Sequence, residues 1–583
     1  MKKPFICIAL VLSIFCLSAQ DITNSAKKVK SQVISSEYDR NALTIIGLKS
    51  DGPIADQIAK MIDTLKISEK FYTHEIGFRN IPFNAKVNLF DKVQQEQVFK
   101  TDVLKLLNEK KVGQGIVAKW FNRQPDGTFN TDVLKERGVY NSDDSDLSIA
   151  TASKRGESSL MDAGLGLVGH SYVLVLGFSN LITQEQYYNK MEAKPETRIM
   201  NGVRGDLIGL LYKLDFNDSV SSVFFQNMWV NKADGDSKTK IANFEATTFP
   251  LIPVKNLIMP VHATQYNAGQ PMAPKVQKTQ DELLRDMVNS SMNNVMNQLT
   301  YQISEFKVKA QVYKTNPIAV KIGKKEGLGF DQRYFVFENR MTQGGQEYSS
   351  RRGVIKSMTV TDNRSVTSGE TEPSYFYQIA GRKIDNMGMF VEQRIDAGIN
   401  LFLGYNQDGL SGADGRLEFY IGRHLSGGQA KGKSNGMTSF KMYIDGGYNT
   451  GEYALNLATP TVNENVTFMR VSAGFNKDYY MTKNIHWGPF LGYGIESATG
   501  KDSKYKIDTQ FVEFGARLGI NIRYNIQLIG SANYYVMFTP AVKDKDGKVL
   551  LDKAGKEIPA EPFETYFPDR GKFGYSYGIR FMF

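Results

Sequence analysis

The sequence predicts a multidomain α+β protein that ends in an antiparallel eight-stranded transmembrane β-barrel. Three observations lead to this fold class. A short apolar leader opens the chain, helix-like and strand-like segments alternate through its middle, and apolar and polar residues alternate strictly through its last third. The composition agrees, because 41% of the 583 residues are hydrophobic and no apolar run reaches the roughly 20 residues that a membrane-spanning helix needs.

The leader at residues 1–20 is interpreted as a secretory signal peptide. Two lysines precede an apolar run over residues 5–17, and small residues follow up to Ala19. A basic start, a short apolar core and a small-residue cleavage zone are typical of a cleaved export signal. We therefore expect export beyond the inner membrane of a Gram-negative cell.

Both cysteines of the chain, Cys7 and Cys16, lie within this leader. The mature chain is therefore expected to contain neither a disulfide nor a thiolate metal site. Lipidation of Cys16 is an alternative, but Phe15 is bulky at a position where that processing requires a small residue.

Residues 21–275 are predicted to form a periplasmic α/β domain, because helix-like segments alternate with short apolar runs. The expected strands are at 43–48, 71–77, 113–120, 171–176, 203–214 and 220–231, and the expected helices are at 54–67, 91–108 and 145–167. We expect the last two strands to form a hairpin. This order of elements resembles the periplasmic α/β domains of the CsgG and TolB N-terminal type.

Residues 276–388 are predicted to form an amphipathic helix followed by a small β-barrel-like module. Apolar residues at helical spacing mark a helix over 280–303, which we expect to pack on a domain core. Docking on a partner or on the inner rim of the barrel is the alternative. Strand-like segments then surround Gly323 and Gly327. They are similar to the C-terminal module of the flagellar H-ring protein FlgT, and the resemblance implies periplasmic docking without a flagellar role.

The strongest pattern lies at the end of the predicted barrel, which covers residues 389–583. From Phe573 to Phe583 the odd positions are apolar or aromatic and the even positions are mostly small or polar. Alternate residues of a strand point to opposite faces, so one face is entirely apolar. This ending resembles the last-strand assembly signal of bacterial outer-membrane proteins, which implies recognition by the barrel-assembly machinery. The signal residues are Tyr575, Tyr577, Ile579, Phe581 and Phe583.

Seven further segments show the same alternation and bring the number of expected strands to eight. They lie at 395–404, 417–422, 440–449, 469–476, 488–496, 512–522 and 526–538. An even number of antiparallel strands closes into a barrel without free edges. The long connection at 540–571 is expected outside the cell and the tight turn at 524–525 inside. The whole resembles eight-stranded outer-membrane barrels of the OmpA and OmpX kind.

The charges that face inward by this alternation bear on whether the barrel is a pore or an anchor. Eight strands leave an interior only wide enough for side chains. The inward positions carry five acids and five bases: Asp396, Glu418, Asp445, Glu496, Glu513, Lys441, Arg470, Arg517, Arg523 and Arg580. Because buried charges require partners, we expect a self-neutralising ion network that closes the barrel. A charged conduction path is the alternative.

Motifs that look catalytic lack the context that their chemistry needs. Residues 164–169 match GxGxxG, but they follow an expected helix and precede an expected strand, which reverses a dinucleotide loop. Residues 169–173 imitate a nucleophile elbow without its closing glycine. Residues 544–547 resemble the start of a calcium loop but lack its later ligands, so we expect a hairpin turn there. We therefore predict no catalytic, cofactor-binding or metal-binding residues and no enzymatic activity.

The predicted function is that of an outer-membrane-anchored structural or assembly protein with a large periplasmic protein-interaction region. A small pore or transport component is the alternative. Expected partners are outer-membrane lipid, the barrel-assembly machinery and periplasmic or outer-membrane proteins. The net charge of +10 is attributed to contact with anionic headgroups or to a solvated surface, and no nucleic-acid partner is expected.

Overall fold

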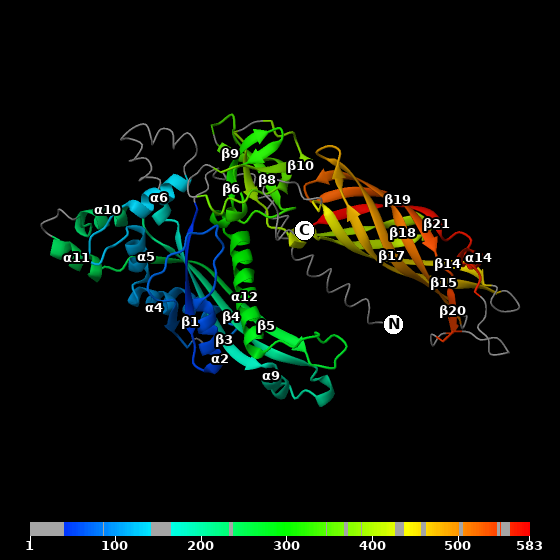
Figure 1. Cartoon of the computed structure of the whole chain (residues 1–583), viewed down its shortest axis with the longest axis horizontal. Helices are drawn as coiled ribbons and strands as arrows, with labels where there is room; N and C mark the ends of the chain where they lie inside the picture. Colours follow the sequence, from blue (N-terminus) through cyan, green and yellow to red (C-terminus); the bar gives the residue numbers. More distant parts are fainter. Residues whose placement is uncertain are drawn as a thin grey trace.

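The computed structural model contains three folded units that follow one another along the chain (Figure 1). The structure describes residues 40–84, 87–141, 165–231, 237–345, 347–366, 371–385, 388–425, 437–455, 462–500, 505–544, 548–549 and 560–583. The predicted signal peptide and most of the predicted helix at 145–167 lie outside these residues.

The first unit, called the α/β unit here, is built on a five-stranded sheet of order β2-β1-β3-β4-β5. Its strands are β1 (Ala42–Lys49), β2 (Asn80–Pro82), β3 (Ser171–Thr183), β4 (Met200–Leu214) and β5 (Leu251–Tyr266). β1 is parallel to β2 and β3, whereas β3, β4 and β5 are antiparallel to one another. The predicted strands at 43–48, 171–176 and 203–214 are therefore confirmed.

Helices cover both faces of this sheet and bury its apolar side chains. One core includes residues of α4 (Val103–Glu109) and α5 (Val112–Trp120), and the other includes residues of α2 (Pro53–Asp63) and α12 (Gln280–Gln302). The remaining helical segments of the unit are α3 (Lys92–Gln97), η2 (Val98–Asp102), α6 (Asp132–Asn141), α9 (Gln184–Lys190), η3 (Pro195–Thr197), α10 (Asp218–Asn227), α11 (Ser237–Ala246) and η4 (Ser304–Phe306).

Two predicted strands of this unit are helices, so the predicted hairpin over 203–231 is wrong. At 113–120 the buried residues Val112, Ile116 and Trp120 recur at helical spacing, which a short apolar run does not distinguish from a strand. At 220–231 the Asn217 side chain accepts a hydrogen bond from the Val220 amide at 3.0 Å and caps α10. The predicted strand at 71–77 is reduced to a single bridge at Tyr72.

The true partner of β4 is β5, which the sequence did not indicate. β5 contains Pro253 and Pro260, and proline weakens any strand prediction because it cannot donate to the sheet ladder. β5 lies at the edge of the sheet, where a missing donor is tolerated.

The long helix α12 packs on the α/β unit, as its apolar stripe predicted. A capping box begins it, in which the Glu282 carboxylate accepts from the Thr279 amide at 2.7 Å. Its buried side chains, including Leu284, Val288 and Val295, belong to the core beneath the first sheet. The predicted boundary between residues 275 and 276 places this helix with the small β-barrel, whereas its buried face packs on the α/β unit.

The second unit, the small β-barrel, closes in the order β10-β7-β6-β11-β8-β9. Its elements are β6 (Lys309–Thr315), β7 (Ile318–Val320), η5 (Lys324–Glu326), β8 (Arg333–Met341), β9 (Glu347–Thr359), β10 (Ser374–Gly381) and β11 (Phe390–Gln393). A barrel-like module was predicted here, but β11 falls beyond its predicted end at residue 388. The resemblances to CsgG, TolB and FlgT remain predictions.

The third unit is a closed antiparallel barrel of eight strands, as predicted. Its strands are β12 (Ile399–Asp408), β13 (Gly412–Tyr420), β14 (Phe440–Leu455), β15 (Val462–Lys477), β17 (Ile485–Gly500), β18 (Tyr505–Arg523), β19 (Ile526–Met537) and β21 (Lys572–Met582). Pairing of β12 with β21 and of β17 with β18 closes the ring. The short elements β16 (Tyr479–Tyr480), β20 (Ala541–Asp544), α13 (Gly422–Leu425) and α14 (Phe563–Tyr566) lie in connections between these strands.

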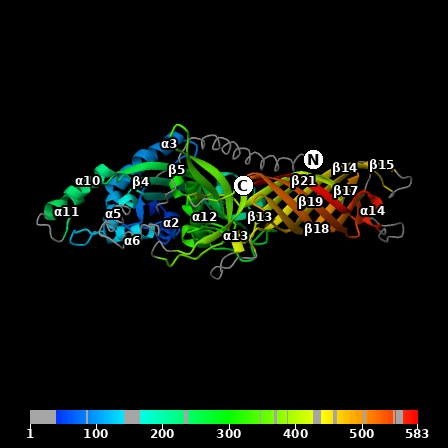
Figure 2. The same cartoon turned by 90° about the horizontal axis from the view of Figure 1, so that it is seen from above.

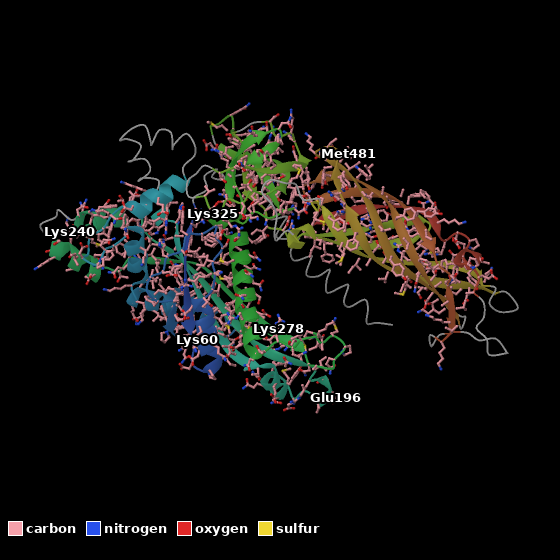
Figure 3. The ribbon with its side chains drawn as sticks, in the orientation of Figure 1. Lys60, Glu196, Lys240, Lys278, Lys325 and Met481 are labelled. Atoms are coloured by element: carbon pink, nitrogen blue, oxygen red, sulfur yellow. The ribbon has the colours of Figure 1, made fainter. Side chains whose placement is uncertain are left out.

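The small β-barrel lies between the α/β unit and one end of the eight-stranded barrel (Figures 1 and 2). That end carries the turns at 477–484 and 524–525, and Met481 marks it in Figure 3. Lys60 and Lys240 lie on the α/β unit, far from the barrel. Among the helices that the structure describes, none combines the length and apolarity needed to cross a membrane.

A lysine is buried in the α/β unit without an acidic partner. Lys70 is 9% exposed, and its Nζ donates hydrogen bonds to Thr300 Oγ1 at 3.1 Å and to the Phe306 carbonyl at 3.2 Å. Among the described residues no carboxylate lies within 4.0 Å of Nζ. Burial lowers the pKa of Lys70 to about 8.

We predict that this lysine makes the α/β unit more stable as the pH rises from 8 to 10.5. In this window the unfolded chain binds a proton that the folded chain has lost, so the free energy of unfolding rises with pH, by about 3 kcal/mol in total. Lys70→Met should remove this rise and stabilise the unit at pH 7. Urea unfolding would be followed in a Trp487→Phe background, so that fluorescence reports on Trp120 and Trp229 of the α/β unit.

The matched control is Lys60→Met, which removes an exposed lysine of α2. It should keep the same dependence on pH as the parent protein. Equal slopes for the parent and for Lys70→Met would contradict the prediction.

Candidate functional site: the filled barrel and its inner junction

The outer surface of the eight-stranded barrel is an apolar belt. Outward side chains such as Val471, Leu491 and Ile522 are 62%, 58% and 56% exposed. We call the end of the barrel that faces the small β-barrel the inner end and the opposite one the outer end. Tyr479 and Trp487 stack at the inner end, with ring centroids 5.3 Å apart. An apolar band bounded by aromatic residues is the surface that a bilayer requires of a transmembrane barrel.

The interior is filled by large side chains that lie over inward glycines of other strands. A Cβ on Gly492 would collide with the Tyr443 hydroxyl, and one on Gly515 would lie 2.8 Å from the Phe490 ring. Gly519 is covered in the same way by the His486 ring. The inward glycines of the alternating pattern therefore make room for aromatic rings, from the paired strand for Gly515 and Gly519 and from a strand further around the barrel for Gly492.

Glu418 is the centre of an ion cluster in the inner half of the barrel. Its Oε2 accepts from Lys441 Nζ at 2.9 Å, and its Oε1 accepts from Arg517 Nη1 at 2.8 Å and from Arg580 Nη2 at 3.0 Å. Asp478 shares two of these cations, at 2.7 Å from Lys441 and 3.3 Å from Arg580. All five side chains are almost fully excluded from solvent.

A second cluster fills the middle of the barrel. Asp445 accepts from Arg416 at 2.8 Å and from Arg470 at 3.2 Å, and Arg470 also donates to Asp414 at 2.9 Å. The Glu513 carboxylate accepts from the Tyr443 hydroxyl at 2.7 Å and from Ser472 Oγ at 2.9 Å, and lies 3.8 Å from Arg416. Each carboxylate of this cluster is therefore matched by a donor from another strand.

The outer end is closed by an ion pair beneath an apolar cap. Arg570 pairs with Glu496, and its guanidinium lies 3.8 Å from the centre of the Phe468 ring. Buried residues of the connection after β19, including Phe563 and Phe567, pack with Phe468. The barrel is thus filled along its length.

We call these charged side chains the barrel-interior network. It contains six acids and six bases: Asp414, Glu418, Asp445, Asp478, Glu496, Glu513, Arg416, Lys441, Arg470, Arg517, Arg570 and Arg580. The structure therefore brings together all of the predicted inward charges except Asp396 and Arg523.

Those two exceptions are corrections to the sequence analysis. Asp396 precedes β12 and pairs with Arg333 of the small β-barrel, outside the barrel interior. Arg523 is exposed, because an irregularity in the pairing of β18 and β19 at Asn521/Arg523 shifts the alternation there.

Sequence reasoning also missed four members of the network. Asp414 and Arg416 share the inward parity of Glu418, but the predicted strand began only at residue 417. Asp478 and Arg570 lie in connections, where alternation carries no information. The predicted assembly-signal residues lie on β21 and just after it, with Tyr575, Tyr577 and Ile579 exposed on the outer surface and Phe581 and Phe583 half-buried.

A buried polar contact joins the small β-barrel to the inner end of the eight-stranded barrel. Both carboxylate oxygens of Asp331 accept from the Ser439 amide at 2.9 Å, and Lys356 Nζ lies 2.8 Å from Asp331. Tyr377 shares a hydrogen bond of 2.7 Å with Ser439 Oγ. Lys356 Nζ also lies 3.8 Å from the centre of the Tyr420 ring. Asp331, Lys356 and Ser439 are at most 3% exposed.

A second contact fixes the same two units through arginines. Asp396 pairs with Arg333 of β8 and with Arg423 of α13. Burial alone would raise the pKa of Asp396, but the two guanidiniums outweigh it and lower this pKa to about 2. Arg333 Nη2 also donates to the Phe583 carbonyl at 2.7 Å. Arg333 therefore holds both ends of the barrel sheet at once.

Backbone and aromatic contacts complete this inner junction. The Asn521 side chain donates to the Ile379 carbonyl, and the Gly381 amide donates to Asn484 Oδ1 at 3.0 Å. Phe335 of the small β-barrel contacts Tyr524 of the turn after β18, with ring centroids 5.5 Å apart. The small β-barrel is thus seated on the inner rim by polar, ionic and aromatic contacts together.

The closed ring, apolar belt and filled interior decide the architecture of this unit. The C-terminal unit has the fold of an eight-stranded outer-membrane β-barrel.

No family model and no curated protein matches the sequence. Within the described residues, no three histidine, cysteine, aspartate or glutamate side chains are grouped to hold a metal ion.

Solved structures of outer-membrane barrels are similar to about a third of the chain. A major outer membrane protein from Thermus thermophilus is 12% identical, covers 32% of this chain and 98% of its own, and has a TM-score of 0.21. The N-terminal β-barrel domain of Pseudomonas aeruginosa OprF is 13% identical over 32% and 96%, with a TM-score of 0.17. Ail, the attachment invasion locus protein of Yersinia pestis, is 12% identical over 32% and 99%, with a TM-score of 0.17.

We predict that Glu418→Gln destabilises the barrel by about 3–5 kcal/mol, since it leaves Lys441, Arg517 and Arg580 buried around a neutral side chain. The free energy of unfolding would be measured in urea with lipid vesicles, using the different electrophoretic mobilities of folded and unfolded barrel. Glu452→Gln is the matched control, because Glu452 is exposed on β14. A loss below about 1 kcal/mol in Glu418→Gln would show that the cluster is hydrated or rearranges.

We also predict that Asp331→Asn loosens the inner junction. The Ser439 amide would lose a charged acceptor worth about 1.5–3 kcal/mol, so its hydrogen exchange should accelerate by about tenfold or more. Exchange of amides in the middle of β14 should stay unchanged, because the barrel itself remains closed. The control is Glu347→Gln, an exposed carboxylate of the same small β-barrel. Equal exchange at Ser439 in both variants would contradict the role of Asp331.

Proposed function

We propose that this chain is an outer-membrane-anchored structural or assembly protein that presents a large periplasmic protein-interaction region. The filled interior of the eight-stranded barrel carries this proposal. Six acids and six bases neutralise one another inside it, and rings lie against the inward glycines. A barrel filled in this way acts as an anchor.

The seating of the small β-barrel supports an anchor with a fixed body. Asp331, Lys356 and Arg333 connect this unit to the inner rim through contacts that exclude solvent. A body joined by a flexible linker would not need such contacts. The proposed role of the barrel is therefore to hold the periplasmic units at a set distance and orientation to the membrane.

The α/β unit offers apolar side chains that a partner protein could cover. Met272 and Val276, in the segment after β5, are 72% and 81% exposed, and Phe90 is 91% exposed before α3. Met272 and Val276 lie four residues apart in one segment, and exposed apolar side chains that gather on one part of a protein mark interaction surfaces. The proposed partners are outer-membrane lipid, the barrel-assembly machinery during biogenesis, and periplasmic or outer-membrane proteins. We propose no enzymatic activity and no nucleic-acid partner.

The proposed topology predicts which residues are accessible from outside the cell. The only cysteines of the chain lie in the predicted signal peptide, so single cysteines can be introduced without background. Glu452→Cys on the outer part of β14 should react with a membrane-impermeant maleimide in intact cells. Lys60→Cys on the α/β unit should react only after the outer membrane is permeabilised. Labelling of Lys60→Cys in intact cells would overturn the topology.

A conductance measurement separates the anchor from the alternative pore. Purified protein in a planar bilayer should show no steady conductance, and a steady conductance that Glu418→Gln alters would favour the pore.

Replacing the barrel by an outer-membrane lipid anchor should retain the proteins that co-isolate with the intact chain, because the periplasmic units are proposed to bind them. The barrel without those units should recover none of these proteins. Recovery by the barrel alone would overturn the proposed division of roles.

A further inference from the structure

Two arginines at the inner rim of the eight-stranded barrel lie beside an aromatic pair. Phe335 of the small β-barrel and Tyr524 of the β18–β19 turn meet edge to face. The Arg351 guanidinium lies 4.1 Å from the centre of the Phe335 ring and 4.6 Å from that of Tyr524. The Arg394 guanidinium lies 5.4 Å from both ring centres. Arg523, next to Tyr524, is exposed.

These arginines lack carboxylate partners, unlike their neighbours. Among the described residues, no acidic oxygen lies within 4.0 Å of the Arg351, Arg394 or Arg523 guanidinium. Arg352, the next residue along β9, lies near both Glu338 and Asp385. The rim therefore carries a local excess of positive charge in a chain where most buried charges are paired.

Two atoms of this site are buried without a hydrogen-bond partner. Arg394 Nη1 and Arg351 Nε are both excluded from solvent and make no hydrogen bond in the structure. Burial and the nearby Arg333 lower the pKa of Arg394 to about 9. Arg394 Nη2 donates to the Met582 carbonyl at 3.4 Å, and both arginines are only half-buried. Half-buried guanidiniums without a carboxylate are suited to an anion that accepts two hydrogen bonds, such as a phosphate.

An apolar groove lies on the outer wall, on the two strands that the same turn connects. Its volume is about 770 Å³, and the strands β18 and β19 that flank Tyr524 form most of it. Small outward residues make its floor: Ala516, Gly530 and Ala532. Larger neighbours stand on both sides, including Trp487 and Tyr577. The groove is therefore a depression in an outer surface of the barrel that elsewhere carries large side chains.

The groove lies at the level of the acyl chains of one leaflet. Its residues on β18, Ala516 to Ile520, lie four to eight positions before Tyr524. At about 3.3 Å per residue and a strand tilt of about 45°, they lie roughly 10–20 Å from the rim. Half of the hydrocarbon core of a bilayer is about 15 Å thick. The arginines lie at the level where the headgroup of the same lipid would be.

We propose that the inner rim binds one anionic glycerophospholipid of the inner leaflet, with its phosphate on Arg351 and Arg394 and one acyl chain in the groove over Gly530. The inference rests on the proposed position of the barrel in the outer membrane with the small β-barrel on its inner side. Arg523 adds charge to the same headgroup site. The lipid would bridge the small β-barrel and the wall of the membrane barrel, and so reinforce the junction between them.

Separate substitutions test the two halves of the site. Arg351→Gln combined with Arg394→Gln removes the headgroup contacts. Gly530→Leu fills the groove, and the structure leaves room for it because a Cβ there meets only one backbone oxygen, at 4.0 Å. Gly446→Leu is its matched control, since Gly446 is also outward and its Cβ would meet only one backbone oxygen, at 3.8 Å. Arg364→Gln is the charge control, because Arg364 pairs with Asp362 and faces the α/β unit.

The experiment is native mass spectrometry of the purified full-length protein, equilibrated in detergent with equal amounts of phosphatidylglycerol and phosphatidylcholine. The parent protein and both controls should retain one phosphatidylglycerol, in about tenfold excess over phosphatidylcholine. The arginine double variant should lose this preference, and Gly530→Leu should lose the retained lipid although its charge is unchanged. Inorganic phosphate at millimolar concentration should not displace the lipid.

Three results would overturn the proposal. These are equal retention of the two lipids by the parent protein, retention by Gly530→Leu that matches the parent, and displacement by inorganic phosphate, which would indicate a phosphate site without an acyl chain. If the double variant loses heat-modifiable mobility and is misfolded, Gly530→Leu alone decides. Because binding is measured on purified protein, its failure is distinct from failure of the topology, which the cysteine labelling in cells measures.

Discussion

A charge inside an eight-stranded barrel must find its partner inside the same barrel. Eight strands leave an interior only wide enough for side chains, so an ionised side chain on an inward position has to be matched by one from another strand or connection. Glu418 meets this constraint with three cations from three other strands. The inward glycines follow from it as well, because the network and the rings that separate its clusters need the space that those glycines leave.

The same constraint extends beyond the barrel into the small β-barrel. Asp396 and Asp331 lie just below the inner end, and their partners come from both units. Rotation of the small β-barrel on the rim would separate several of these buried groups at once. The orientation of the small β-barrel is therefore set by electrostatics at the junction, much as strand register is set by pairing inside the barrel.

The alternation of the last third was enough to predict eight strands, their inward face and most of the charged network, because a period of two directly reports which face a residue is on. It failed where the period is broken, at Arg523 beside an irregular pairing and at Asp478 and Arg570 in connections. In the α/β unit, short apolar runs do not distinguish a helix from a strand, so the sequence predicts strands where α5 and α10 form and no strand where the proline-containing β5 lies. The junction could not be predicted, because Arg333 and Lys356 look like ordinary strand charges until distant segments are placed beside them.

The position of Arg333 gives the small β-barrel a mechanical role. The seam between β12 and β21 is where strands far apart in the chain meet, and Arg333 holds Asp396 just before β12 and the Phe583 carbonyl just after β21. Arg333, which lies outside the barrel sheet, therefore links the two strands at which the barrel closes. Separation of these two strands would first have to break the contacts of Arg333, so a force on the small β-barrel acts directly on the closure of the eight-stranded barrel.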